Sequence, residues 1–213
     1  MAYLRKGLLK MLVSGFLFCL LVMPVSGLAA DKPKVITWNM HAAFPQAFWF
    51  VQAWQSFASE VARATNGELV ITVYPAAGLG IQPGDVVTAV SKKLVPIAEI
   101  AASYAEGAVP EFKQLSLFYV CKTIADHEKK VAAIRGDLEK LMFDKYKIKI
   151  LAFNNGNPTD LYLNKEINSM EDFKGFKVRT MGPMMAAQAK AIGLVPMTIA
   201  PPEVPVALER KLK

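Results

Sequence analysis

Hydrophobic positions along the chain follow helix-type and strand-type patterns in turn. Apolar residues at helical spacing predict long helices over 46–65 and 126–145, and shorter ones over 85–90 and 184–192. Alternating or β-branched apolar stretches predict strands at 34–40, 69–73, 94–98, 147–153, 160–164, 176–180 and 194–198. Because strands and helices alternate, the pattern predicts an α/β fold with a mainly parallel sheet.

The first thirty residues have the pattern of a secretory signal. Arg5, Lys6 and Lys10 precede an apolar run over 11–25, and small residues follow at 26–30. The run is shorter than the roughly 20 residues that a membrane-spanning helix prefers. We therefore expect a signal peptide over 1–30 and a periplasmic protein, with an uncleaved membrane anchor as the alternative.

Composition narrows the class of protein. The chain has 213 residues, 53% hydrophobic and 20% charged, as in a globular protein. Its net charge is +7, but no run of Lys and Arg is interleaved with aromatics, so we expect no nucleic-acid partner. After the signal only Cys121 remains, and neither histidine has a partner at zinc-site spacing. We expect no disulfide, no metal and no cofactor.

Arg179 is the first candidate for ligand binding. Ser169 with Asp172 is a helix-start signal, Gly175 suits the end of that short helix, and a strand at 176–180 follows. On this strand Phe176 and Val178 point to one face, and Lys177 and Arg179 to the other. A guanidinium at a strand end can bind a carboxylate through two parallel hydrogen bonds. The alternative is an ordinary surface ion pair.

Other polar residues follow predicted strands as Arg179 does. Asn39 and His41 end the first strand, and a cluster of Asn, Gly and Pro at 154–158 follows another. Ligands of α/β sheets bind beyond the carboxyl ends of strands. The 154–158 turn is also the predicted crossing between two lobes, 31–154 and 155–213. No nucleophile elbow or phosphate-binding loop is present, so we expect small-molecule binding without catalysis.

Several stretches, in order along the chain, match a known family. These are 36–40, 65–75, 167–179 and 191–210, with Lys177-Val178-Arg179 in the most specific of them. The chain resembles the periplasmic solute-binding proteins of TRAP transporters, of the C4-dicarboxylate-binding type. The resemblance implies a periplasmic-binding-protein-like, two-lobed α/β fold that closes on a small organic acid. It also implies delivery of the acid to a TRAP membrane permease, and no enzymatic activity.

The resemblance also assigns residues. The principal carboxylate-binding Arg of the family falls on Arg179, and a second polar contact falls near Asn157 and Thr159, where some members carry an Arg. Lys211 stands where the family has Gly, and two residues follow it. We therefore expect an incomplete second lobe. Two alternatives stay open at this point, an exported enzyme on the same two-lobed plan and a nonfunctional remnant of a solute receptor.

Overall fold

The computed structural model describes residues 34–76, 78–117, 120–154 and 160–210. The chain divides into two compact units, Met1–Lys34 and Val35–Lys213. Only the second is described below, because the predicted signal segment over 1–30 lies outside the described residues. Within those residues, no helix is both long and apolar enough to cross a membrane.

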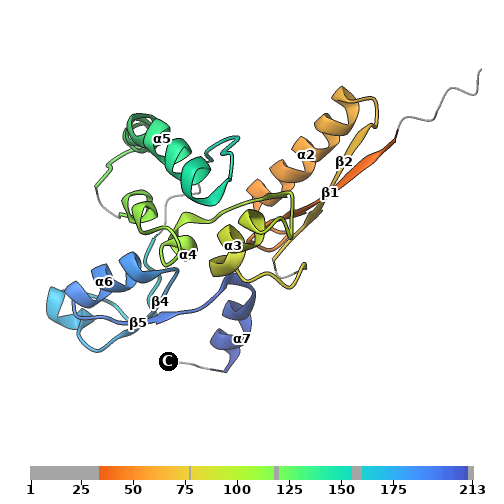
Figure 1. Cartoon of the computed structure of the whole chain (residues 1–213). Coiled ribbons are helices and arrows are strands. Elements are labelled where there is room, and N and C mark those ends of the chain that lie inside the picture. Colours follow the sequence, from red (N-terminus) through yellow and green to blue (C-terminus); the bar gives the residue numbers. More distant parts are fainter. Residues whose placement is uncertain (1–33, 77, 118–119, 155–159, 211–213) are drawn as a thin grey trace, which may run out of the picture. The chain divides into compact units, whose positions relative to one another are not determined.

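Strands and helices alternate, as the sequence predicts (Figure 1). In chain order the elements are β1 (Ile36–His41), α2 (Trp49–Ala64), β2 (Leu69–Tyr74), η1 (Pro83–Asp85), α3 (Val86–Ser91), β3 (Ile97–Ala98), α4 (Ala102–Ala105), η2 (Pro110–Leu115), α5 (Ile124–Tyr146), η3 (Met170–Phe173), β4 (Lys177–Thr180), α6 (Pro183–Ala191), β5 (Val195–Thr198), η4 (Pro201–Glu203) and α7 (Val204–Glu209). The η elements are short 3₁₀ helices.

The strands form two parallel sheets. In the first, β1 lies between β2 and β3, with Met40 opposite both Val73 and Ile97. In the second, β4 pairs with β5, and Arg179 lies opposite Met197. The parallel pairing that the alternation of strands and helices predicts is therefore confirmed.

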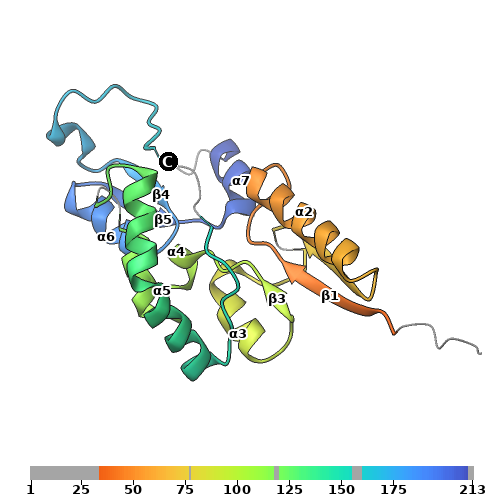
Figure 2. The ribbon, with the colours of Figure 1, turned by 90° about the horizontal axis from the view of Figure 1, so that it is seen from above.

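Helix α2 covers one face of the first sheet, and Figure 2 shows it lying along β1. Met40, Ala58 and Ile71 are buried between them. The helix ends at Ala64, with Thr65 as its C-cap, because Asn66 and Gly67 adopt φ angles of 50° and 81°, which a continuing right-handed helix does not allow. The side chains of β1 that alternate with this face, Asn39 and His41, point to the opposite side of the sheet.

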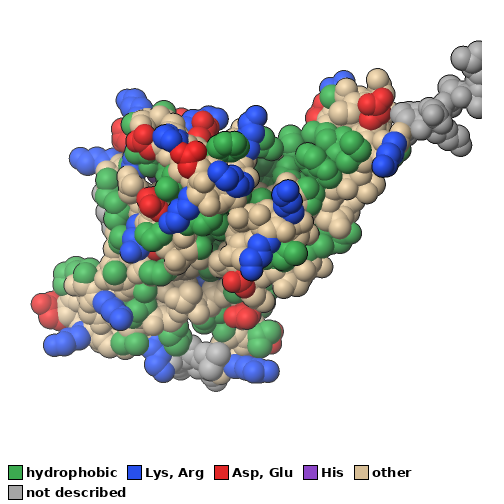
Figure 3. All heavy atoms as spheres, in the orientation of Figure 1, with side chains coloured by type: hydrophobic (Ala, Val, Ile, Leu, Met, Phe, Trp, Pro, Cys, Tyr) green, Lys and Arg blue, Asp and Glu red, His purple; other side chains and the backbone are tan. Residues whose placement is uncertain are grey.

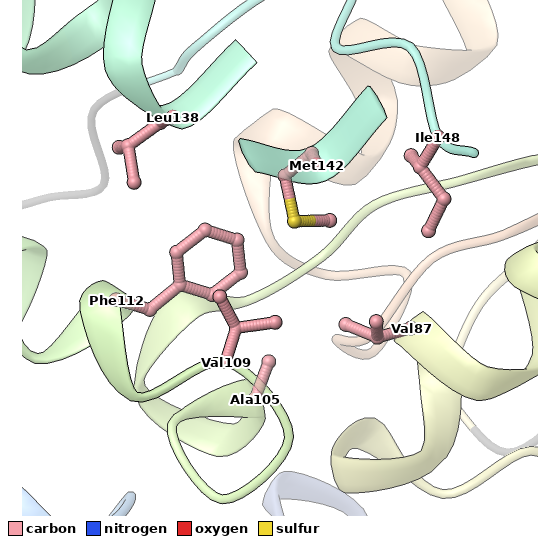
Figure 4. Packing of buried hydrophobic residues seen from close by; sticks show 7 residues of the cluster. All are labelled: Val87, Ala105, Val109, Phe112, Leu138, Met142 and Ile148. Atoms are coloured by element: carbon pink, nitrogen blue, oxygen red, sulfur yellow. The ribbon is translucent and has the colours of Figure 1, made fainter. Parts of the chain in front are cut away.

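A second core forms where α5 packs against the α3 and α4 region. Figure 4 shows its seven buried residues: Val87, Ala105, Val109, Phe112, Leu138, Met142 and Ile148. Helix α5 begins with a capping box in which Thr123 and Asp126 bond to each other's backbone N–H. Over the outer side of α5, Figure 3 shows mixed positive and negative side chains, as predicted for its solvated face.

Two predicted strands are wrong. The structure has no strand over 147–153 or over 160–164. A strand exists only through hydrogen bonds to a neighbour, and no described segment pairs with either stretch. Ile148 instead packs into the α5 core, where it is 6% exposed. The alternation of apolar residues over 147–153 therefore reflects burial of one side of an extended segment and not strand pairing.

Candidate functional site around Arg179

Arg179 lies near the carboxyl end of β4, on the strand that the sequence predicts. The next residue, Thr180, is 1% exposed, and its hydroxyl lies 3.2 Å from that of Thr198 on β5. Arg179 itself is half-buried. None of the carboxylates in the described part of the chain forms an ion pair with it. Among these residues, the surface ion pair that was the alternative for Arg179 is therefore not formed.

Two neutral oxygens hold the guanidinium of Arg179. Its Nε donates to the backbone oxygen of Ile199 at 3.0 Å, and one terminal nitrogen donates to the hydroxyl of Tyr104 at 2.5 Å. A guanidinium carries five N–H donors in a fixed plane. These two bonds orient that plane without neutralising its charge. The remaining donors are available to an anion.

Tyr104 adds a second polar group to the site. Burial raises the pKa of its hydroxyl to about 12, while the charge of Arg179 acts to lower it. Tyr104 therefore keeps its proton at neutral pH. Its oxygen accepts from Arg179, so its own proton remains to be donated. Arg179 and Tyr104 together present several donors and one positive charge, the combination that suits a carboxylate.

Aromatic side chains adjoin this polar pair. The rings of Tyr104 and Phe44 are 6.5 Å apart and approach edge to face. Phe44 packs in turn on Phe48 and Phe50, at 5.4 and 5.0 Å. The polar donors are therefore next to an apolar wall that comes from the loop after β1 and the start of α2.

A shallow hollow of about 340 Å³ has Ile199, the residue that accepts from Arg179, in its lining. It is lined by Ile199, Pro202, Glu203, Val206, Ala207 and Arg210. Ile199 thus contributes both to this hollow and, through its carbonyl, to the orientation of Arg179. The lining is mainly apolar, with Glu203 and Arg210 as the charged members.

The other predicted site residues on β1 differ in burial. Asn39 is exposed on β1, and His41 is fully buried with no hydrogen bond to either ring nitrogen. Burial lowers the pKa of His41 below its ordinary value, which keeps the ring neutral. Among the described residues, neither side chain bonds to Arg179. Asn157 and Thr159 fall outside the described residues.

Two residues near these strand ends, Tyr104 and Glu99, were not predicted as site residues from the sequence. Tyr104 lies in α4, a segment whose pattern of small residues gave no clear element. Glu99 directly follows β3, so the strand-end rule that selected Asn39 could have found it. Its carboxylate accepts from Ala43 N at 3.0 Å. Burial raises the pKa of Glu99 above its ordinary value, and the hydrogen bond from Ala43 N opposes part of that rise.

No group of three or more His, Cys, Asp and Glu side chains in the described ranges could hold a metal ion. Cys121 is a free, half-buried thiol. The polar groups around Arg179 donate N–H and O–H hydrogens, whereas a metal ion is bound by ligand atoms that supply lone pairs. The N–H and O–H groups around Arg179 therefore suit an anion better than a metal ion.

The chain is similar in sequence to one protein family and in structure to several solved receptors. Residues 40–212 match the family model of the bacterial extracellular solute-binding proteins, family 7. No curated protein matches the chain. Among solved structures, DctP7 of Bordetella pertussis, an extracytoplasmic solute receptor binding pyroglutamic acid, is 29% identical with a TM-score of 0.79. The match covers 84% of this chain and 58% of DctP7.

Two further receptors show the same likeness. A TRAP solute-binding protein from a marine metagenome, with co-purified pyroglutamate, is 24% identical, with a TM-score of 0.77 and coverage of 83% and 58%. A receptor from Sulfitobacter sp. NAS-14.1 with bound β-D-galacturonate is 22% identical, with a TM-score of 0.74 and coverage of 83% and 59%. The chain thus spans 58 or 59% of their length, and over that part the expected α/β fold of the two-lobed receptors is confirmed.

Proposed function

Because the chain belongs to the bacterial extracellular solute-binding proteins, family 7, we propose that it captures a small organic acid outside the cytoplasm and delivers it to a TRAP-type membrane transporter. No bond is made or broken in this role. The segment over 1–30 directs export to the periplasm and is then removed. The two lobes are 31–154 and 155–213, and their closure on the acid presents a surface to the permease.

The arrangement of Arg179 carries the proposal. Its guanidinium is oriented by Ile199 and Tyr104, has no ionic partner among the described residues, and keeps donors for a carboxylate. Asn157, Thr159 and Asn39 supply polar contacts to the rest of the solute when the lobes close.

The solute class follows from these groups together with the relatives. The donors of Arg179 and Tyr104 suit one carboxylate, and the aromatic wall at Phe44 suits an apolar or ring-shaped body. Two of the similar receptors bind pyroglutamate, and another binds β-D-galacturonate, both ring-shaped monocarboxylates. We therefore expect a monocarboxylate here, in preference to the aliphatic dicarboxylates expected from the family's type.

Calorimetry with the full chain tests this assignment. Pyroglutamate, galacturonate and pyruvate are titrated, and pyroglutamamide serves as the uncharged counterpart of the first. We expect binding of at least one acid and none of the amide. Arg179→Lys keeps the charge but loses the planar fork. Because a hydrogen bond to a charged group contributes about 1.5–3 kcal/mol, we expect a tenfold or larger loss of affinity.

Arg135→Lys is the matched control, since Arg135 is an exposed arginine on α5 that pairs with Glu139. Its affinity should equal that of the unaltered chain. If the Arg179→Lys variant bound the acid as tightly as the unaltered chain, Arg179 would not be a ligand-binding residue. Failure of the unaltered chain to bind any of the acids would contradict the proposed function itself.

A further inference from the structure

One turn of chain at α4 contacts the segment from Arg179 to Met184 in three places. These contacts are Tyr104 with Arg179, Ser103 with Gly182, and Glu106 with Met184. The two segments are nearly eighty residues apart in sequence. Arg179 and Gly182 are separated by only two residues, so any movement of the turn at Gly182 also moves the end of β4.

Gly182 is in van der Waals contact with α4 through its backbone. A Cβ atom placed on Gly182 would lie 1.8 Å from the backbone oxygen of Ser103. The φ of Gly182 is −171°, an extended value open to any residue, so close approach and not backbone conformation requires glycine here. The absence of a side chain brings α4 directly onto the turn between β4 and α6.

The same absence leaves helix α6 without a cap of its own. Gly182 is the N-cap residue and has no side chain to accept from the first-turn N–H groups, and Pro183 has no N–H. Glu106 supplies the acceptor from a distant element. Its Oε2 accepts from Met184 N, the second residue of α6, at 2.8 Å.

Glu106 is unusually placed for an acidic residue. It is 1% exposed, and its second oxygen, Oε1, is buried without a hydrogen bond. Burying a polar group without partners is unfavourable, so packing alone does not account for a Glu at this position. The positive end of the α6 dipole, together with the bond to Met184, offsets part of that cost.

We propose that Glu106 is a positioning residue for Arg179. Its carboxylate holds the start of α6 against α4, and this contact keeps the end of β4 where Tyr104 meets the guanidinium. The orientation of the remaining N–H donors then depends on a residue that does not itself contact Arg179 or the solute. The inference rests on the proposed function, since it concerns the same anion site.

Substitution of Glu106 tests the role directly. Glu106→Ala removes the acceptor, and we expect the affinity of the full chain for its organic acid to fall about tenfold. Glu106→Gln keeps an oxygen that can accept from Met184 N, so it should restore most of that affinity. Glu111→Ala is the control, because Glu111 is a half-buried glutamate on η2 whose Oε2 is also buried without a partner. It should bind like the unaltered chain.

Non-additivity separates positioning from a general loss of stability. In an Arg179→Lys background, Glu106→Ala should cause little further loss of affinity, because the group that it orients is already gone. A purely structural role would instead add its full effect in both backgrounds. A Glu106→Gln variant as weak as Glu106→Ala, or fully additive effects, would overturn the proposal.

A ligand-free measurement keeps this test apart from that of the proposed function. Hydrogen exchange by NMR should accelerate at Met184 N–H and at Arg179 Nε–H in Glu106→Ala, and should slow again in Glu106→Gln. Unchanged exchange at Arg179 Nε–H would overturn the positioning role while leaving organic-acid binding intact. A chain that binds no acid but shows the expected exchange would overturn the proposed function and keep the positioning role.

Discussion

The chain builds a strand–helix–strand unit twice, and the two differ in what holds them. In the first, β1–α2–β2, strands of six residues flank a helix of sixteen. Its buried residues form two clusters: Met40, Ala58 and Ile71, and Ala42, Phe50 and Val51. In the second, β4–α6–β5, strands of four residues flank a helix of nine. None of its residues belongs to a buried hydrophobic cluster in the described structure.

The second unit is held by backbone and polar contacts instead. Val195 N donates to Phe176 O at 2.7 Å, and Gly175 N donates to Gly193 O at 2.9 Å. Contacts from α4 to Gly182 and Met184 add to these. A two-stranded sheet is marginal without packing from other elements. The candidate binding residue Arg179 therefore lies on the unit with less apolar support, so its geometry depends on a neighbouring element.

Truncating one buried aliphatic residue in each unit should show the difference most strongly. Ile71 lies within the first unit's core, whereas Leu194 is buried just before β5, outside the three clusters. We expect Ile71→Ala to lower the free energy of unfolding by about 3 kcal/mol and Leu194→Ala by about 2 kcal/mol, because a less densely packed site relaxes more. Urea unfolding of both variants measures this, and equal losses would contradict the contrast.

The next effect concerns the contact between α4 and the second unit. Gly182→Ala should lower the free energy of unfolding by about 2–3 kcal/mol, because the new methyl group collides with Ser103 O. Gly136→Ala is the matched control in the interior of α5, where a Cβ meets nothing within 4 Å. It should raise stability by about 0.5–1 kcal/mol. Thermal unfolding that shows the same sign for both would refute the close contact at Gly182.

The smallest effect should be a pH dependence that arises in the first unit. Burial lowers the pKa of His41 below 6.5, so near and below that pH the unfolded chain binds a proton that the folded chain does not. Stability should therefore fall as the pH drops from neutral through 6.5 toward the folded-state pKa.

Thermal unfolding at a series of pH values measures this slope. His41→Leu should flatten it, and the difference between the two curves isolates His41 from other titrating groups such as Glu99. An unaltered slope in His41→Leu would show that burial does not lower the pKa of His41 in the folded chain.

Hydrophobic patterning predicted most of the elements that carry their own amphipathic signal. The helix expected over 46–65 is α2, the one over 126–145 is α5, and the strand expected over 69–73 is β2. The patterning was wrong at 147–153, where apolar alternation had no pairing strand. It was silent at α4, whose four residues Ala102–Ala105 are small or polar and form one turn. One turn of helix is too short to show a period.

The candidate site divides in the same way. Strand alternation and a turn signal selected Arg179, because both are local properties. Tyr104 could not be selected, since its role depends on a hydrogen bond to a residue 75 positions away. His41 followed from the strand-end rule, yet the structure buries it completely. A strand end brings side chains to one edge of a sheet but does not determine which of them reaches solvent.

Local sequence patterns specify the class of fold, the family, and an arginine at a strand end, because periodicity and short motifs act over a few residues. What that arginine can bind depends on its partners in the folded chain. The carbonyl of Ile199 and the hydroxyl of Tyr104 orient it, and no carboxylate among the described residues neutralises it. These partners are distant in sequence, and their positions depend on packing that includes the contact at Gly182. Packing of this kind arises only when the whole chain has folded.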